Sequence, residues 1–405
     1  MYFSKIKMKL KVYTANYPYG YSESFLTNEL DVLKKTIPSI ELIPYTQNGA
    51  IQKNRDSTIA LTPYKADGEK IGFADYFFLV QIMLKELFNI SQKKFFLKKG
   101  RKHFALLKNA LLLAKWIEKN DAPQKEVLHY SFWMNEWALA LAILKKKNKI
   151  NHFVFRVNGY DIWGERHDGN YLPFRYFIYS QTEAVYALSE TAVNYLKKLN
   201  YFPQKIKLAY FGTKELGVKN KKTNSKFTVF SCSSAIPLKR LDKIAKVLAL
   251  VKSPLVWIHH GEGKTIENVE ELLAKNGANI TFQLSKKKED YLEVLELMKK
   301  SSPDLFINLS STEGLPVTLI EAMSFGIPLL ANKVGSCHEL FKANIGVLVE
   351  KDEEEKNIAL KIDQLIANPN QLLQTEEIKT YWETNFSAKK NYREFANNLM
   401  QHLEE

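Results

Sequence analysis

The sequence has 405 residues, of which 45% are hydrophobic, 12% aromatic and 25% charged, and its 58 Lys and Arg against 44 Asp and Glu give a net charge of +14. A chain of this length suits two domains, and its proportions exclude a wholly disordered, collagen-like or disulfide-scaffold protein. Two cysteines predict a reducing cytoplasmic setting, and no apolar stretch approaches the length that spans a bilayer.

Strand and helix patterns alternate through the first half of the chain. Strands are predicted at 9–14, 41–45, 127–130, 152–156 and 184–188. Helices are predicted from about 24, across 73–119 with breaks around Ser91 and Gly100, at 136–145 and from 189. Strands that alternate with helices predict a doubly wound parallel sheet.

The alternation restarts in the second half. Strands are predicted at 226–232, 255–259, 279–284, 305–309 and 327–331, with helices between them. We therefore predict an α/β protein of two Rossmann-like domains, 1–205 and 206–380, followed by a helical tail at 381–405. Since ligands bind at the carboxyl ends of parallel strands, the expected site is the cleft where the two domains face each other.

The strongest motif is the block 306–340, which reads FINLSSTEGLPVTLIEAMSFGIPLLANKVGSCHEL. An apolar strand leads into a turn, and a helix begins near Pro316, where proline is favoured because its missing amide would be unpaired anyway. The free amides that follow suit a diphosphate. Glu313 in the turn and Glu321 in the helix can accept hydrogen bonds from vicinal sugar hydroxyls, although such a pair alone is also typical of a solvated and a capping glutamate.

This block resembles the donor-binding signature of the retaining nucleotide-sugar glycosyltransferases of family four, which have the GT-B fold. The resemblance is strong after about residue 226 and weaker before it. It implies that the second domain holds the donor, that the first holds most of the acceptor, and that the final helix returns to the first domain. It also implies that Glu321 binds the nucleotide ribose and Glu313 the hydroxyls of the transferred sugar. Contacts to the sugar and diphosphate are implied for Gly314, Leu315, Pro316, Val317 and Thr318.

A second motif, SCSSAIPLKRLDKIAK at 231–246, follows a strand and leads into a helix. Lys239 matches the phosphate-binding lysine of the family, and a cation there offsets the charge that grows on the leaving diphosphate. Many members carry an Arg five residues earlier, where this chain has Ser234. Arg240 is a candidate substitute, and a solvated helix start is the alternative for the Lys–Arg pair.

A third motif, RVNGYDIWGER at 156–166, resembles the family's H-G-x-D loop. The position of its histidine is taken by Asn158, which can hydrogen-bond a sugar hydroxyl but cannot carry protons near neutral pH. The family retains anomeric configuration through front-face attack, with the donor phosphate accepting the acceptor's proton, so an enzymic base is not obligatory. Asp161 and Arg166 are candidates for the acceptor pocket or for a structural turn built on Asn-Gly.

The opening turn, YPYGYSESF at 17–25, is expected to lie near the donor phosphate or the acceptor. Gly20 allows a close backbone approach, so it is a donor-side candidate. Tyr19 and Glu23 are candidate acceptor contacts, and Glu23 is equally placed as a charge at a helix N-terminus.

Positive charge is concentrated in the front half, where residues 1–200 carry 30 basic and 18 acidic residues. The stretch 85–119 holds ten Lys or Arg against two Glu, with aromatic residues between them. A basic helix with aromatics on its other face predicts docking on an anionic membrane, and a core helix with a solvated lysine face is the alternative. Base readout relies on Arg, so nucleic acid is not an expected partner. The predicted docking residues are Lys93, Lys94, Phe95, Phe96, Lys98, Lys99, Arg101 and Lys102.

These patterns predict a retaining glycosyltransferase that needs no metal and no cofactor besides its nucleoside-diphosphate sugar. Glu313, Lys239 and Asn158 are the catalytic candidates. The expected acceptor is a hydroxyl of a glycan or lipid-linked acceptor in bacterial surface polysaccharide synthesis, at the cytoplasmic face of the membrane. A weakly catalytic sugar-nucleotide binder or assembly partner, and a GT-B-fold sugar-nucleotide epimerase, are the alternatives.

Overall fold

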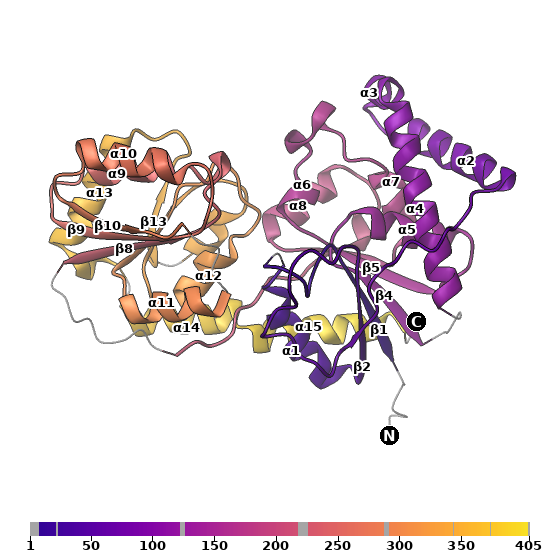
Figure 1. Cartoon of the computed structure of the whole chain (residues 1–405), viewed down its shortest axis with the longest axis horizontal. Helices are drawn as coiled ribbons and strands as arrows, with labels where there is room; N and C mark the ends of the chain where they lie inside the picture. Colours follow the sequence, from indigo (N-terminus) through magenta and orange to yellow (C-terminus); the bar gives the residue numbers. More distant parts are fainter. Residues whose placement is uncertain are drawn as a thin grey trace. The chain divides into compact units, whose positions relative to one another are not determined.

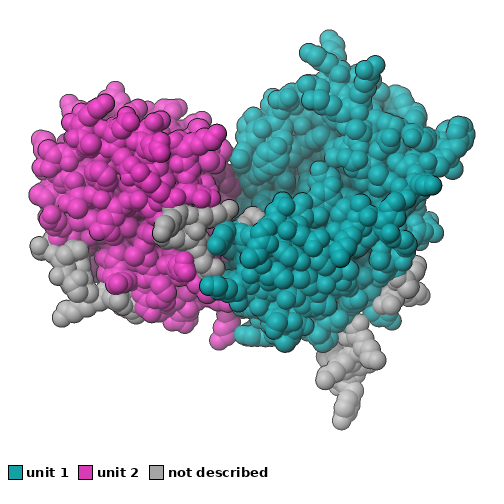
Figure 2. Space-filling view, in the orientation of Figure 1, with its two compact units in different colours: residues 1–210, 392–405 teal, residues 211–391 magenta. Residues whose placement is uncertain are grey.

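A computed structural model describes residues 8–21, 23–121, 126–217, 226–286, 291–342, 344–372 and 374–403. The chain forms two compact units, which Figure 2 colours separately: unit 1 comprises residues 1–210 and 392–405, and unit 2 comprises residues 211–391. The sequence predicted the first boundary at 205/206. Unit 1 extends further because its last strand, β7 (Ile206–Leu208), pairs with β6 (Ala184–Ala187).

Unit 1 is built on a seven-stranded parallel sheet in the order β3-β2-β1-β4-β5-β6-β7. The order reverses beside β1, as in doubly wound nucleotide-binding folds. The remaining strands are β1 (Lys9–Thr14), β2 (Ser39–Pro44), β3 (Ala60–Leu61), β4 (Val127–Ser131) and β5 (His152–Val157).

Helices cover both faces of this sheet (Figure 1). The predicted helical stretch 73–119 is helical, with interruptions near Ser91 and Gly100, and it divides into three helices. The helices of unit 1 are α1 (Leu26–Thr36), α2 (Phe73–Asn89), α3 (Lys93–Lys98), α4 (Gly100–Asn120), α5 (Glu136–Lys146), α6 (Gly159–Ile162), α7 (Arg175–Gln181) and α8 (Glu190–Lys198).

A buried ion pair fixes one face of the unit 1 sheet. Arg156 on β5 donates from Nη2 to Glu29 of α1 at 3.0 Å, and both side chains are fully buried. Tyr130 on β4 donates its hydroxyl to the same carboxylate at 2.8 Å. The ring of Phe395 lies 4.4 Å from the Arg156 guanidinium carbon, so the C-terminal helix covers the pair. A buried charge needs such partners, because desolvation is costly otherwise.

Unit 2 repeats the same strand order, with β10-β9-β8-β11-β12-β13 all in parallel. The fold class predicted from the sequence is therefore confirmed for both units. The strands are β8 (Phe227–Cys232), β9 (Leu255–His260), β10 (Ile280–Leu284), β11 (Leu305–Asn308), β12 (Leu329–Asn332) and β13 (Gly346–Val349). The helices are α9 (Leu241–Ala249), α10 (Ile266–Asn276), α11 (Tyr291–Ser301), α12 (Val317–Ser324), α13 (Glu355–Ala367) and α14 (Thr375–Phe386).

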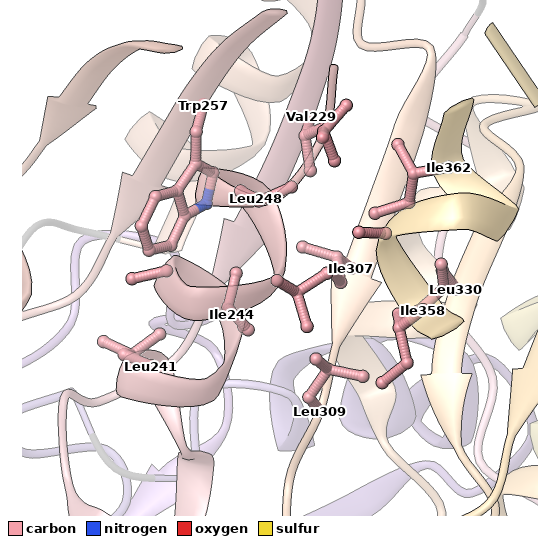
Figure 3. Packing of buried hydrophobic residues seen from close by; sticks show 14 of the residues in the cluster. Val229, Leu241, Ile244, Leu248, Trp257, Ile307, Leu309, Leu330, Ile358 and Ile362 are labelled. Atoms are coloured by element: carbon pink, nitrogen blue, oxygen red, sulfur yellow. The ribbon is translucent and has the colours of Figure 1, made fainter. Parts of the chain in front are cut away.

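A cluster of buried hydrophobic residues of unit 2 lies on the sheet face that α9 and α13 cover (Figure 3). Ile244 and Leu248 of α9 and Ile358 and Ile362 of α13 are buried there. Burial of one such side chain contributes roughly 1.5–3 kcal/mol. The sheet is thus held rigidly, and the loops at its carboxyl end are fixed at their bases.

The helical tail predicted at 381–405 consists of two helices that meet at Ser387. α14 stays in unit 2, where Trp382 donates from Nε1 to Thr213 Oγ1 at 2.8 Å. The last helix, α15 (Ala388–Gln401), begins in unit 2 and continues into unit 1 from Tyr392. The expected return of the chain to the first domain is therefore made by α15.

Candidate functional site

The main candidate site lies in unit 2 at the carboxyl ends of β8 and β11, where the strand order of the sheet reverses. Ligands of doubly wound folds bind at this position. The loop after β8 leads through a short 3-10 turn, Pro237–Lys239, into α9. The loop after β11 carries Glu313 and leads into α12. The topology therefore brings together two motifs that are more than 70 residues apart in the chain.

The two loops meet in an ion pair of side chains. Lys239 Nζ lies 2.6 Å from Glu313 Oε1, and Asn308 Nδ2 donates to the same oxygen at 3.2 Å. Glu313 is nearly buried, while the Lys239 side chain keeps about a quarter of its surface exposed. An ammonium group has three donors, so Lys239 can bind an oxyanion without leaving Glu313.

Backbone hydrogen bonds hold the loops of this site in place. Ser311 donates its amide to the Leu238 carbonyl at 2.9 Å, which ties the Glu313 loop to the Lys239 turn. Ser336 donates its amide to the Gly314 carbonyl at 3.0 Å. Beside it Gly335 has φ +52, and a Cβ there would come within 2.0 Å of the Glu313 carbonyl oxygen. Only glycine fits this approach, so the position of Glu313 is set by the chain's backbone.

The start of α12 differs by one residue from the prediction. Pro316 is the N-cap, with φ −72 and ψ 112, and the helix begins at Val317. Leu315 and Pro316 are buried, whereas Gly314, Val317 and Thr318 are partly exposed. The first amides of a helix lack intrahelical acceptors and carry the positive end of the helix dipole. This helix start can therefore receive an anion.

Glu321 lies on the second turn of α12 and is buried. Burial raises the pKa of Glu321 to about 7, and a hydrogen bond with the Tyr291 side chain acts in the opposite direction. Its carboxyl group is therefore close to half-ionised at neutral pH. A ligand hydroxyl that donates to it favours the ionised form.

Three polar residues of this site were missed by the sequence analysis. Asn308 ends β11 and orients Glu313, and its Oδ1 accepts the Ser310 amide at 2.9 Å. Asn332 ends β12 and donates to the carbonyls of Leu309 and Ser310. Among the described residues, the buried Ser310 hydroxyl has no hydrogen-bond partner. The signal was an asparagine closing each of two apolar strands, LFIN and LLAN.

The other predicted residues of the second motif do not join the ion pair. Arg240 donates from Nη1 to the Lys351 carbonyl at 3.0 Å and adopts φ +50 as the N-cap of α9. Lys243 also donates to the Lys351 carbonyl. Arg240 therefore anchors the start of α9 to the segment after β13. Ser234 is exposed in the loop after β8.

The opening turn of unit 1 is held by its own glutamate. Glu23 accepts hydrogen bonds from the amides of Ala15, Asn16 and Tyr17, at 3.1, 2.7 and 2.8 Å, and from the Trp133 indole. This explains why Glu23 tolerates φ +58, and it assigns Glu23 to loop structure. Gly20 makes its close approach to the Asn48 carbonyl, and Tyr19 bridges to Ile51. These residues thus pack against the segment 48–51.

Asn158 and Asp161 form a capped turn at the end of β5. Asn158 donates from Nδ2 to the Phe132 carbonyl at 3.1 Å, and its amide donates to Asp161. Burial raises the pKa of Asp161 to about 6, opposed by hydrogen bonds from the amides of Met134 and Asn158. Among the described residues Asn158 Oδ1 has no hydrogen-bond partner. Arg166 lies over the Tyr160 ring at 5.8 Å.

Unit 1 also has a cavity of about 540 Å³ at the carboxyl ends of β4 and β5. Trp133, Tyr160, Glu136, Asp161 and His167 contribute to its wall together with apolar side chains. The cavity combines aromatic surfaces with a few polar groups, which is typical of a small-molecule site. A larger cavity of about 750 Å³ in unit 2 lies at the amino ends of the strands, near Phe227 and Leu305, away from the site described above.

The predicted membrane-docking residues fall into two groups. Lys93, Lys94, Lys98, Arg101 and Lys102 are exposed, and Lys99 is partly exposed. Phe96 is buried among His103, Tyr171 and Phe174, and Phe95 is partly buried against Gly169 and Tyr171. The aromatic half of that prediction is wrong for Phe96, because its ring is part of the core.

Two further searches were confined to the described ranges. Within them no cluster of three or more His, Cys, Asp or Glu side chains is arranged to hold a metal ion. No helix in the same ranges combines the length and the hydropathy needed to cross a bilayer.

The fold and this site define a GT-B protein. HepE from Anabaena, crystallised with UDP, superposes with a TM-score of 0.69 and 14% identity, over 97% of this chain and all of that chain. The lipopolysaccharide outer core galactosyltransferase WaaB superposes with a TM-score of 0.66 and 15% identity, over 97% of this chain and 99% of that chain. At these identities the likeness shows the fold alone.

Two comparisons of sequence, which cover part of the chain, point to glycosyl transferases. Residues 213–381, which lie in unit 2, match the family described as glycosyl transferases group 1. The O-antigen biosynthesis glycosyltransferase WbnH of Escherichia coli is 34% identical over 128 residues. That match covers 31% of this chain and spans about a third, 34%, of the relative.

Proposed function

We propose that this protein is a retaining glycosyltransferase that binds a nucleoside-diphosphate sugar on unit 2. The observation that carries the proposal is the Lys239–Glu313 pair beside the start of α12, at the strand-order reversal of the unit that matches group 1 glycosyl transferases. A cation and free helix amides beside one another suit a diphosphate, and a carboxylate held by side chains suits sugar hydroxyls. HepE is a GT-B neighbour whose crystals contain UDP, which supports this donor class.

The proposed roles follow from position and charge. Lys239 binds the diphosphate and offsets the negative charge that develops on it as the bond to the sugar breaks. Glu313 accepts from hydroxyls of the transferred sugar. Glu321 accepts from the nucleotide ribose in its ionised form. Because Lys239 and the helix amides neutralise the diphosphate, we propose that transfer needs no metal ion.

The proposed chemistry is front-face substitution at the anomeric carbon. The bond from that carbon to the diphosphate oxygen breaks while the bond to the acceptor hydroxyl oxygen forms on the same face. The acceptor's proton passes to the departing phosphate oxygen, so no side chain of the protein needs to accept it. Asn158 can then serve through its Oδ1 as a hydrogen-bond acceptor for a sugar hydroxyl.

We propose that the acceptor binds in the unit 1 cavity. Trp133 and Tyr160 offer aromatic surfaces to the apolar faces of a sugar, and Glu136 and His167 offer polar groups to its hydroxyls. The class of acceptor is a glycan or lipid-linked saccharide of a bacterial surface polysaccharide. The support for this class is the partial match to a relative named for O-antigen biosynthesis.

The test is a panel of UDP-, GDP- and ADP-sugars incubated with the protein and lipid-linked saccharide acceptors. The expected result is a new glycosidic bond whose anomeric configuration, read by NMR coupling, equals that of the donor. Lys239→Met should lower transfer at least 100-fold, whereas Lys333→Met, at an exposed lysine, should not. An inverted product refutes retention. Epimerised donor or tight nucleotide binding without any transfer refutes the transferase and favours one of the two alternatives.

A further inference from the structure

The helix α2 presents its apolar side chains to solvent. Phe73, Phe77, Val80, Leu84 and Phe88 follow one another at intervals of three or four residues, so they line one face of the helix. Their exposed fractions are 93, 65, 45, 48 and 72%. Large apolar side chains that gather on one exposed face mark an interaction surface rather than a core.

The acidic residues of the same helix face inward. Glu86 is fully buried, and it accepts from the Tyr171 hydroxyl at 3.0 Å and from the Phe177 amide at 2.9 Å. Asp75 lies within 3.1 Å of Lys147 and 2.6 Å of Lys115. These contacts fix the rotation of α2, so the apolar face cannot turn into the core. The buried face of α2 carries Leu79 and Ile82 beside Glu86, so the exposed stripe is a second apolar face, which the core of unit 1 leaves uncovered.

A basic surface lies next to this apolar face. α2 packs against α3 and α4, which Figure 1 shows beside it in unit 1. Lys93, Lys94 and Lys98 of α3 are exposed, as is its Leu97. From residue 87 to residue 117 the sequence has eight Lys or Arg and no Asp or Glu. None of the exposed cations of α3 forms an ion pair with a described residue.

We propose that the α2 face and the basic surface of α3 together bind an anionic lipid bilayer, with α2 lying in its interface. The five apolar side chains enter the boundary between headgroups and acyl chains, and the lysines contact the lipid phosphates. A second copy of this chain is disfavoured as the partner, because it would bring another cationic surface against this one. Nucleic acid has no apolar counterpart for the α2 stripe.

This inference goes beyond the proposed transferase activity and does not depend on it. It also corrects where the sequence analysis looked for the apolar part of the membrane contact, since those side chains lie on α2 and Phe96 is in the core. The basic part stays where the sequence predicted it. Binding to vesicles therefore tests the surface without any turnover.

The experiment is flotation of the full chain with vesicles of 70% phosphatidylcholine and 30% phosphatidylglycerol, compared with pure phosphatidylcholine. We expect binding to the anionic vesicles, at least tenfold weaker binding to the neutral ones, and weakening as salt rises from 0.1 to 0.5 M. The double variant Phe77→Ser/Phe88→Ser should bind the anionic vesicles at least tenfold more weakly. Lys93→Gln/Lys94→Gln/Lys98→Gln should do the same and lose the preference for anionic lipid.

Two matched controls use exposed residues elsewhere. Leu250→Ser/Leu360→Ser removes comparable apolar surface from unit 2, and Lys197→Gln/Lys198→Gln removes charge from α8; each should bind vesicles within twofold of the parent. Unchanged thermal unfolding shows that a variant is folded. The proposal is overturned if the parent chain does not float, or if the Phe77/Phe88 variant floats as well as the parent. It is also overturned if that variant turns a stable dimer into a monomer while vesicle binding stays the same.

Discussion

Each unit places a glutamate in a loop that follows one of the two strands beside the strand-order reversal, but the two carboxylates are held differently. In unit 2, Glu313 is held by the side chains of Lys239 and Asn308, and the loop backbones bond to one another. In unit 1, Glu23 follows β1, and three backbone amides and the Trp133 indole bind its carboxylate. A carboxylate at the end of a strand that accepts from several of the chain's own amides, as Glu23 does, is thus assigned to loop structure and not to ligand binding.

The largest effect is expected at Glu313. Glu313→Gln keeps the shape of the side chain but removes its charge, so Lys239 loses its counterion and the sugar loses an ionic acceptor. We expect transfer to fall at least 100-fold, which corresponds to about 2.7 kcal/mol, while thermal unfolding changes little. The matched control is Glu350→Gln at an exposed ion pair, for which transfer should stay within twofold. Equal losses in the two variants would contradict the assignment.

The opposite pattern is expected at Glu23. Glu23→Ala leaves three amides and an indole without their acceptor, and a buried unpaired donor costs about 1–3 kcal/mol. We expect the free energy of unfolding of unit 1 to fall by roughly 3 kcal/mol, measured by urea denaturation, with UDP binding to the protein unchanged. A variant that is fully stable but fails with every acceptor would instead return Glu23 to the acceptor site.

At Glu321 we expect an effect that depends on pH. Burial raises the pKa of Glu321 to about 7, and the nucleotide ribose is proposed to bind the ionised form. UDP affinity should therefore rise about tenfold between pH 6 and pH 8, as the ionised fraction rises. The Glu321→Gln variant should lack this pH dependence of UDP affinity. Any pH dependence that the variant keeps comes from titration of UDP itself and can be subtracted. Calorimetry in two buffers checks this prediction, because binding near pH 7 should release about half a proton more from the parent protein than from the variant.

The same shift has a consequence for stability. A carboxyl group whose folded pKa lies above its unfolded value of 4.5 contributes stability that is present below about pH 4.5 and is lost as pH rises through about 7. The stability of Glu321→Gln relative to the parent should therefore increase between pH 5 and pH 8. A constant difference over that range would show that the pKa of Glu321 is not raised.

The smallest effect is expected at Arg240. Its guanidinium donates to the Lys351 carbonyl, so Arg240→Met should cost about 1 kcal/mol of stability and leave UDP affinity within twofold. Lys239→Met, one residue earlier, should weaken UDP binding at least tenfold. Isothermal titration of both variants distinguishes the two neighbours, and equal losses of affinity would place Arg240 at the phosphate.

The fold, and the placement of the unit 2 motifs on strand, turn and helix, were predictable from the sequence because their signals are local. Alternating strands and helices define both sheets, and the spacing of Glu313 and Glu321 around Pro316 is carried by one contiguous block. The contacts of Glu23 could not be predicted, since they depend on its left-handed backbone and on Trp133, 110 residues away. Which face of α2 is buried could not be predicted either, because the periodicity of a sequence shows that a helix has two faces but not which of them packs against the core.

Because α15 begins in unit 2 and continues into unit 1, unit 1 is completed only after unit 2 has been synthesised. Phe395, which covers the buried pair of Arg156 and Glu29, leaves the ribosome only after all of unit 2 has been translated. Until then nascent unit 1 lacks this covering ring over its buried charges. A ribosome stalled before Tyr392 should therefore display a unit 1 that proteases cleave more readily than the finished one.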